Sequence, residues 1–382
     1  MVSIDNLKFK YQSLPDNKKA VVKMGIILGG ILLLFIIIVI IVSIVMGNKK
    51  SYEQFENIVL RASERYVTDN PTVIDQSTVY GTTEITIDTL VTNNYMKEVS
   101  KYLGEDRSCT GKVLVYRNMK DLKYIPKIKC GTDYSDVSIS EKIILNEEVV
   151  SENGGLYAED GGYVFRGQHV NNNVVYSGQN WKIISIDKVG NIKMIQADKI
   201  NDYVEWDDRY NAAFYYNSGF NEFQGKTGTE SSRIKDHINQ AYNGSALTDE
   251  AKKIIVPTEY CIGKRAETDK SKDGSTECAL KTELSPAGLL SVHEFLHASL
   301  DEKCIDATSR ECGNYNYFTD ISGSYWTATA SNKNTADVYY INNVLYISKA
   351  SNAYPLRLVV VVNGLVNYKS GSGTTQDPYI LD

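Results

Sequence analysis

The chain of 382 residues has no charged side chain between Lys23 and Lys49. Residues 24–48 are mostly Ile, Leu, Val and Gly, and at about 1.5 Å per residue such a helix exceeds the roughly 30 Å hydrocarbon core of a bilayer. No small-x-small cleavage site follows, because residues 49–51 are Lys-Lys-Ser. The run is also longer than the core of a signal peptide. The sequence therefore predicts a retained transmembrane helix, with membrane lipid as its first partner.

Cysteine is absent before this helix, and all six cysteines of the chain follow it. Positive charges flank both ends of the helix in similar numbers, so the positive-inside rule barely orients it. An even set of cysteines on one side predicts an oxidising exterior on that side. We therefore expect residues 1–23 to be the cytoplasmic tail of a single-pass protein of a bacterial cell membrane, with everything after the helix extracellular.

The cysteines follow one another in pairs along the chain, and each pair would close a short loop. Three local disulfide bonds are therefore the expected pairing, although six cysteines allow 15 connectivities. The expected pairs are Cys109 with Cys130, Cys261 with Cys278, and Cys304 with Cys312.

A stripe of basic residues is lacking as well. Lys and Arg total 41 against 47 Asp and Glu, and these charges are dispersed along the exterior chain. A phosphate backbone demands clustered positive charge, so nucleic acid is not an expected partner. The exterior chain of about 335 residues is long enough for two domains with their own cores. We expect an α+β protein with a boundary near residue 141.

The first region, residues 49–140, is expected to be a small α/β stalk domain next to the membrane. Ser51-Tyr-Glu-Gln54 has the form of a capping box, which predicts an amphipathic helix that ends at Asn70-Pro71. Further expected elements are a strand over 83–89, a short helix near 90–102, and a hairpin of 109–116 with 124–130 that the first cysteine pair closes.

This order of a span, a helix and a small antiparallel sheet resembles the layout of type IV pilin-like and pseudopilin-like proteins. The glycine-phenylalanine cleavage motif of that family, with a glutamate a few residues into the apolar segment, is missing from this chain. The resemblance implies a pilus or secretion-apparatus subunit as one alternative function. The other interpretation is a spacer domain on a stalk.

The second region, residues 141–382, is expected to form an α+β domain with antiparallel strands. Strand-like segments at 172–187 and 192–196 surround a turn at 188–191. Asn363-Gly364 is a hairpin signal, because both residues tolerate positive φ. Further expected elements are a helix marked by Ile234, Ile238 and Tyr242, a second helix over 248–256, and strands at 336–341, 344–347, 356–362 and 365–368.

His293-Glu-Phe-Leu-His297 matches the H-E-x-x-H pattern, in which two histidines one helical turn apart bind zinc and the glutamate acts as general base. No third ligand follows at the spacing of the longer motif, where this chain has leucine and lysine. Ser291 and Glu294 also form a capping box, which gives Glu294 a role at a helix start. A membrane-anchored zinc metallopeptidase built on His293, His297 and Glu294 is therefore the alternative. The main expectation is a protein without enzyme activity, metal or cofactor.

The same segment, residues 288–299, is similar to the strand-to-helix element of bacterial C-type-lectin-like domains related to the formylglycine-generating enzyme. The matching residues are Leu289, Ser291, Glu294, Phe295 and Ala298, while Leu290 stands where the family has proline. Residues 324–329 and 354–359 resemble later strands of that family. The closing residues 371–381 resemble the tail of anchored surface proteins of Gram-positive gut bacteria.

The resemblance covers about residues 154–382 and implies a C-type-lectin-like fold that binds an extracellular protein or glycan. The family's copper-oxidase chemistry needs a cysteine near the last strands, and none follows Cys312. The glutamate-proline-asparagine and glutamine-proline-aspartate motifs of calcium-dependent lectins are absent, and Gln376-Asp-Pro378 has the wrong order. What the resemblance implies is therefore a surface binding or adhesion protein.

Tyrosine and asparagine crowd the final third of the chain, and these residue types are typical of adaptable binding surfaces. About half of the aromatic residues in a β-rich domain face its core. Trp326 and Tyr340 are assigned to the core. The expected contact residues are Tyr315, Tyr317, Asn332 and Asn334.

Overall fold

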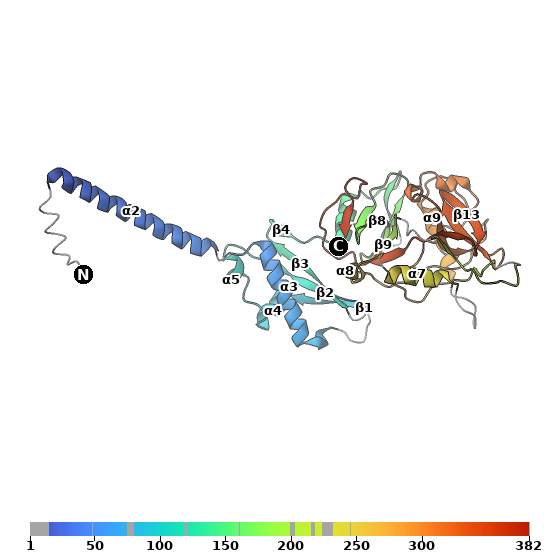
Figure 1. Cartoon of the computed structure of the whole chain (residues 1–382), viewed down its shortest axis with the longest axis horizontal. Helices are drawn as coiled ribbons and strands as arrows, with labels where there is room; N and C mark the ends of the chain where they lie inside the picture. Colours follow the sequence, from blue (N-terminus) through green and yellow to red (C-terminus); the bar gives the residue numbers. More distant parts are fainter. Residues whose placement is uncertain are drawn as a thin grey trace.

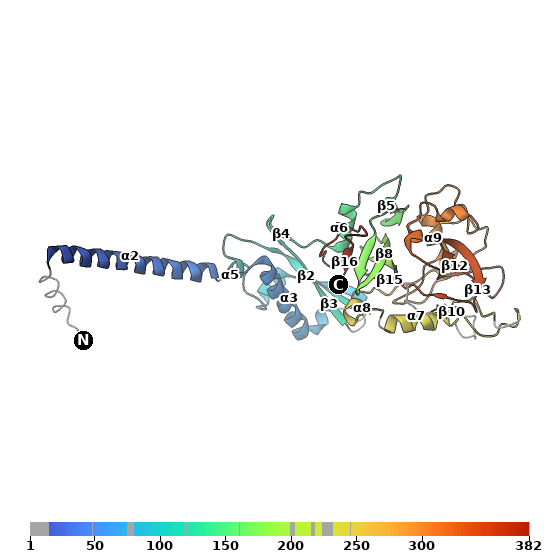
Figure 2. The same ribbon diagram turned by 45° about the horizontal axis from the view of Figure 1, so that its top comes forward.

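The computed structural model describes residues 15–47, 49–74, 80–118, 121–159, 161–198, 203–214, 218–223, 232–244 and 246–381. Its first element is the long helix α2 (Asp16–Gly47), which projects away from the rest of the chain (Figures 1 and 2). The stretch Lys18–Ile37 is long and apolar enough to cross a membrane, with a mean hydropathy of 2.6 and none of it buried. Such a helix suits a membrane anchor or a signal sequence. Most of the expected cytoplasmic tail, residues 1–14, lies outside the described residues.

A small α+β unit follows, in which one long helix packs on an antiparallel sheet. The helix begins with the predicted capping box of Ser51 and Gln54 and ends at Asn70, whose N–H bonds the carbonyl of Tyr66. The sheet has the strand order β1-β2-β3-β4. The elements of this unit are α3 (Tyr52–Asp69), η1 (Pro71–Val73), β1 (Tyr80–Thr86), α4 (Ile87–Thr92), α5 (Ser100–Leu103), β2 (Thr110–Asn118), β3 (Asp121–Cys130) and β4 (Tyr134–Ser135).

Two details of this unit differ from the sequence-based expectation. The strand predicted over 83–89 stops at Thr86, because the Thr86 hydroxyl accepts a hydrogen bond from the Thr89 amide at 3.0 Å and caps α4. Ile87 therefore lies in a helix, where its side chain is buried. The helix predicted near 90–102 is split into α4 and α5 around Asn94, which has a φ of +62°.

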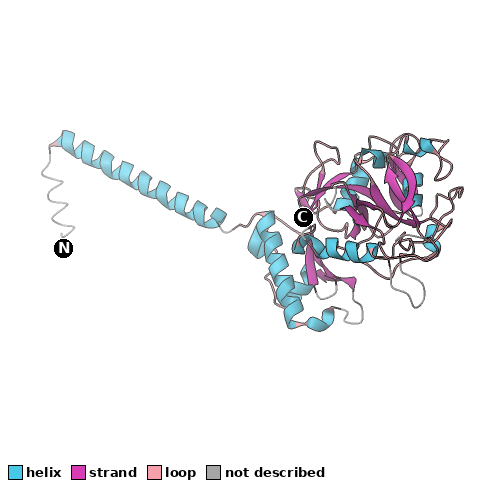
Figure 3. Cartoon of the chain, turned by 45° about the vertical axis from the view of Figure 1, so that its right-hand side comes forward, coloured by secondary structure: helices cyan, strands magenta, loops and turns pink. Residues whose placement is uncertain are grey.

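A second, larger unit contains most of the strands and several short helices around them (Figure 3). Its largest sheet has the order β15-β9-β8-β6-β5, with β7 beside β8 and β16 beside β7. Separate sheets pair β11-β12-β13 and β10-β14. The strands are β5 (Gly155–Glu159), β6 (Gly162–Arg166), β7 (Asn173–Tyr176), β8 (Gln179–Ile186), β9 (Ile192–Gln196), β10 (Tyr203–Glu205), β11 (Tyr325–Ala330), β12 (Asp337–Asn342), β13 (Val344–Lys349), β14 (Ala353–Pro355), β15 (Val359–Val362) and β16 (Tyr379–Leu381).

Its strand pairs are antiparallel as expected, except that β16 runs parallel to β7. The predicted strand 172–187 is a hairpin of β7 and β8, because Ser177 and Gly178 both have positive φ and turn the chain. The predicted helix 248–256 is confirmed only over Asp249–Lys252. The helices are α6 (Ile139–Asn146), α7 (Ile234–Asn243), α8 (Asp249–Lys252), η2 (Glu277–Ala279), α9 (Val292–Ala298), η3 (Arg310–Gly313) and η4 (Tyr317–Asp320).

The hairpin predicted at Asn363-Gly364 is wrong. The Asn363 side chain accepts a hydrogen bond from the Leu365 amide at 3.0 Å, and β15 pairs with β9 instead of with the residues that follow it. A Cβ atom on Gly364 would lie 1.9 Å from the carbonyl oxygen of Gly190. Glycine is needed here for a close approach of two chain segments, which a local sequence pattern does not distinguish from a turn.

Two large clusters of buried side chains correspond to the two units. One includes residues from Phe55 to Cys130, and the other includes residues from Ile139 to Leu381. The second cluster thus begins two residues before the expected boundary at 141. The cysteines are joined in the three predicted local pairs: Cys109–Cys130, Cys261–Cys278 and Cys304–Cys312.

The two units share a small apolar contact across the sheet of the first one. Val113 and Val115 of β2 face the core beneath α3, whereas Leu114 on the same strand faces the other way. Leu114, Tyr116 and Ile125 pack against Val256, Leu365 and Val366 of the larger unit. This follows from the alternation of side chains along a strand, since β2 and β3 are apolar on both faces.

Ile125→Ala is expected to lower the free energy of unfolding by about 2–4 kcal/mol, because a buried isoleucine leaves a cavity when truncated. Ile125 is 2% exposed and lies between the units, so the melting of the two units should also separate. Calorimetry of the full chain in nanodiscs measures both effects. Leu145→Ala, at a position that is 75% exposed, is the control. Equal stability of the two variants would contradict the packing described here.

Candidate functional site

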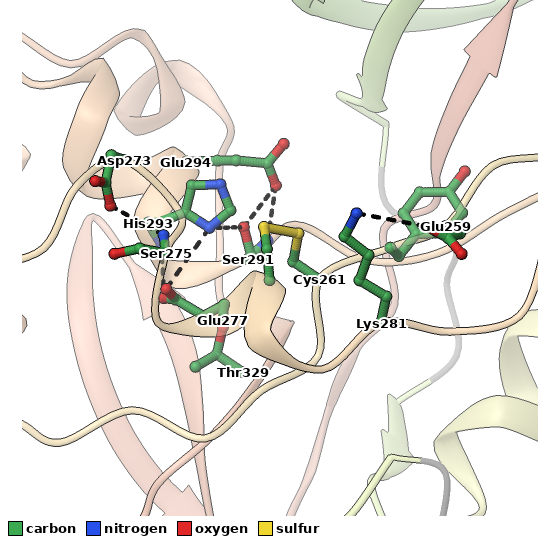
Figure 4. The surroundings of a disulfide bond; sticks show 12 residues. Glu259, Cys261, Asp273, Ser275, Glu277, Lys281, Ser291, His293, Glu294 and Thr329 are labelled. Atoms are coloured by element: carbon green, nitrogen blue, oxygen red, sulfur yellow. Dashed lines mark hydrogen bonds and ion pairs between the residues drawn. A yellow bond between two sulfur atoms is a disulfide. The ribbon is translucent and has the colours of Figure 1, made fainter.

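The H-E-x-x-H segment lies on α9, a helix of about two turns. The capping box predicted at its start is confirmed, with the Ser291 amide donating to Oε2 of Glu294 at 2.9 Å. The Ser291 hydroxyl lies 2.8 Å from the same carboxylate oxygen and 2.8 Å from Nδ1 of His293 (Figure 4). Ser291 is itself 2% exposed, so this hydroxyl is a structural group of the helix start.

A cavity of about 280 Å³ opens beside α9. It is lined by the end of β5, by β6, β8 and β9, by α9 and η4, and by residues 272–273 of the loop that the Cys261–Cys278 disulfide closes. Ile184 and Ser185 both line it although they are neighbours on one strand. The pairing of β8 with β9 shifts register between Ile183 and Ser185, and such a bulge changes the direction of a side chain.

Glu294 is a charged group on the wall of this cavity. Its Oε1 lies 2.5 Å from Nζ of Lys193, which comes from β9. Burial by itself would raise the pKa of Glu294, but the charge of Lys193, the neighbouring His293 and the bonds from Lys193 and Ser291 lower that pKa from 4.5 to about 2. Glu294 is therefore an ionised member of a partly buried ion pair, and its other oxygen serves the helix cap.

The two histidines are held by different carboxylates. The His293 amide donates to Oε1 of Glu277 at 3.0 Å, and Nδ1 of its ring faces Ser291. Nε2 of His297 lies 2.5 Å from Oε2 of Glu159, at the end of β5. Burial lowers the pKa of the His293 ring. Among the residues that the structure describes, no group of three or more His, Cys, Asp or Glu side chains is placed to hold a metal ion.

A buried ion pair positions the loop that forms one wall of the cavity. Arg265 and Glu277 are both 0% exposed, and Nη1 of Arg265 donates to each oxygen of Glu277 at 2.9 Å. Nη2 of Arg265 donates to the carbonyls of Asp269 and Ser271, which shapes the loop just before Lys272. Glu277 and His293 are joined as well, so the loop is held against α9 (Figure 4).

Gly274 lets this loop approach the helix closely. It has a φ of +81°, and a Cβ atom on it would lie 2.9 Å from Nε2 of His293. Any L-residue with a side chain would be strained in this backbone conformation and would press on the histidine ring. Lys272 and Asp273 are thereby held at the cavity.

Three polar side chains on the cavity wall have no hydrogen-bond or ion-pair partner among the described residues. The Tyr317 hydroxyl is fully buried without a partner. Neither the hydroxyl of Ser185 nor the ammonium group of Lys272 makes a hydrogen bond or an ion pair within the described chain. Buried polar groups are normally satisfied, so such groups around one cavity indicate room for a ligand or water.

The four expected contact residues differ in their exposure in the structure. Tyr317 is 1% exposed and packs against Phe318 in a tilted arrangement with ring centroids 4.3 Å apart, so its assignment to an exposed surface is wrong. Tyr315 is 61% exposed, and Asn332 is also exposed. Asn334 is half-buried, with its side chain bonded to the Ala336 amide and to Asp337. A contact role for Tyr315 and Asn332 stays a prediction.

Sequence reasoning missed most of the cavity. Lys193, Ser185 and Glu159 lie about a hundred residues or more before α9, on strands that carry no recognisable motif. The signals available were the H-E-x-x-H segment, of which His293, Glu294 and His297 line the cavity, and the expected contact residue Tyr317.

No protein-family model matches this sequence, and no curated protein or solved structure is significantly similar to it. The resemblance to C-type-lectin-like domains therefore rests only on the residues quoted above.

Glu294→Gln is expected to destabilise the protein by about 3 kcal/mol near neutral pH, because the lowered pKa of Glu294 is stabilisation that the folded state gains above pH 4.5. That stabilisation is lost as the pH falls from 4.5 towards 2, so the difference between variant and parent should shrink there. Urea unfolding at several pH values measures it. Glu302→Gln, at an exposed position, should show no such pH dependence. A difference for Glu294→Gln that stays constant down to pH 2 would refute the ion pair.

Proposed function

We propose that this protein is a single-pass membrane protein that holds a ligand-binding module outside the cell. The observation that carries the binding role is the cavity beside α9, where Tyr317, Ser185 and Lys272 present polar groups that the described protein leaves unpartnered. Ligand pockets typically combine an apolar wall with a few polar groups of this kind. Val164, Phe165 and Ile184 supply the apolar wall.

Binding accounts for the H-E-x-x-H segment better than peptide hydrolysis does. A general base needs a carboxylate free to take a proton from water, and Glu294 is bound to Lys193 and to the Ser291 amide. His293 and His297 each have a ring nitrogen beside a protein group. The resemblance to C-type-lectin-like domains supports the same proposal, because members without the copper or calcium site are binding modules.

An extracellular position is supported by the three disulfide bonds, which persist in oxidising compartments. The apolar part of α2 would then be the membrane anchor, and the α3 unit a stalk. A pilus or secretion-apparatus role stays an alternative for which the described residues offer no specific observation.

A thiol reagent that does not cross membranes should label the reduced protein in intact cells that lack an outer membrane. The physical reason is that all six cysteines follow the apolar helix. Mass spectrometry of the labelled protein measures the effect, and an added protease should remove nearly everything after Gly47. Labelling that requires cell lysis would reverse the proposed orientation.

The binding role is tested with the full chain in nanodiscs, by thermal shift against a library of sugars, sugar acids and short peptides. Tyr317→Phe should leave the melting temperature nearly unchanged, because its hydroxyl makes no hydrogen bond, and should weaken any ligand that enters the cavity. Tyr203→Phe makes the same change at an exposed position that does not line the cavity, and it should have no effect on binding.

Two results would contradict the proposal. One is the absence of ligand binding in the cavity. It would be seen if no compound stabilised the parent, or if both tyrosine variants bound every compound as the parent does. The other is one tightly held zinc ion per chain that is lost in His297→Ala, together with zinc-dependent peptide cleavage, which would establish the peptidase alternative.

A further inference from the structure

We propose that the cavity beside α9 takes a small organic monocarboxylate, with the ammonium group of Lys272 as its counter-charge. This inference rests on the proposed binding function and specifies the class of ligand. It follows from which charged groups of the cavity are already neutralised by the protein and which are not.

The acidic groups of the cavity have partners of their own. Glu294 is bound to Lys193 at 2.5 Å, and Glu159 lies 2.5 Å from the His297 ring and 3.3 Å from Nη1 of Arg166. Asp273 accepts hydrogen bonds at 2.9 Å from the Ser275 amide and from the Ser271 hydroxyl. Glu294 and Glu159 are thus paired within the protein, and Asp273 is exposed to water and held by neutral donors.

Of the two lysines that line the cavity, one has a carboxylate partner and the other has none in the described part of the chain. Lys193 is used by Glu294, whereas Lys272 is half-buried and makes no ion pair with the described residues. The charge of Arg166 repels it and that of Asp301 attracts it, and both groups lie beyond ion-pair or hydrogen-bond distance of it. A partly buried ammonium without a partner is unfavourable, so an anion that enters the cavity removes that cost.

Besides the ammonium group, two hydroxyl groups of the cavity wall can donate hydrogen bonds to a ligand that carries a carboxylate. Tyr317 and Ser185 line the same cavity, and neither hydroxyl has a partner in the described chain. The Tyr317 hydroxyl is fully buried in the wall, so a ligand reaches it only if the wall shifts slightly. They match the acceptor oxygens of an acid, of a sugar or of an amide. A ligand without acceptors would leave both of them unpaired.

The number of free charges and the size of the cavity limit the ligand. With Lys272 as the unpartnered cation, a single negative charge is balanced, while a phosphate dianion would need a second free cation and would lie near Glu159, Asp273 and Glu294. The volume of about 280 Å³ corresponds to roughly nine water molecules. A sugar acid or an acylated dipeptide is of this size.

Titration calorimetry of the full chain in neutral phosphatidylcholine nanodiscs tests the inference. The probes are glucuronate with glucose as its neutral counterpart, and acetyl-dialanine with its C-terminal amide. The first pair tests a sugar acid, and the second tests the carboxylate of a peptide. At least one acid should bind more tightly than its neutral counterpart, on the order of tenfold or more.

Lys272→Gln should remove that advantage, while Lys272→Arg should keep most of it because the charge remains. Lys270→Gln is the matched control, since Lys270 is an exposed lysine of the same loop that does not line the cavity. The control variant should bind the acid as the parent does.

Four outcomes would overturn the inference. The first two are equal binding of acids and neutral counterparts, and equal losses of acid affinity in the Lys272→Gln and Lys270→Gln variants. The other two are tighter binding of methyl phosphate, measured as a comparison ligand, than of either acid, and no binding of any probe. Failure here is distinguishable from failure of the proposed function. If no probe binds but a library compound still depends on Tyr317, the binding role stands and only the ligand class is wrong.

Discussion

The larger unit depends on the buried ion pair between Arg265 and Glu277. Both side chains are fully buried, and each is bonded to more than its partner. The Arg265 amide donates to the carbonyl of Ala330, and the Arg265 carbonyl accepts from the Asn332 amide. A buried ion pair is tolerable only when further hydrogen bonds replace the lost water. The carbonyls of Asp269 and Ser271 and the His293 amide supply them, while Nε of Arg265 has no partner among the described residues. One pair thus joins the disulfide-closed loop, the start of α9 and the end of β11.

This constraint explains why the H-E-x-x-H segment matches a zinc motif in sequence but not in its contacts. In the structure its two histidines and its glutamate are each held by other protein groups. Glu277 holds the His293 amide, Lys193 arrives from β9 to neutralise Glu294, and Glu159 arrives from β5 to hold His297. The same packing leaves a cavity between α9 and the strands. The loop and the start of α9 are held in place by Arg265 and Glu277, which do not line the cavity.

Contacts across the sheet of the α3 unit join that unit to the larger one. The sheet of the α3 unit is apolar on both faces, with α3 on one face and the larger unit on the other. Hydrogen bonds between the side chains of Lys127 and Asn367, at 2.7 Å, and between the Asn367 side chain and the Pro126 carbonyl, at 3.0 Å, accompany this contact. These contacts join the two units, and the cavity lies in the unit farther from α2 (Figure 1).

The sequence by itself determined the features that depend on neighbours in the chain. These are the apolar helix, the capping boxes at Ser51 and Ser291, the β2–β3 hairpin and the local cysteine pairs. Each follows from a spacing of a few residues or from an unbroken apolar run. Tertiary structure alone decided the rest. It turned Tyr317 inward, made Gly364 a point of close approach, and brought Lys193 and Lys272 to a helix far from them in sequence. Such contacts join residues separated by many others, and no local periodicity records which distant side chain will meet a given one.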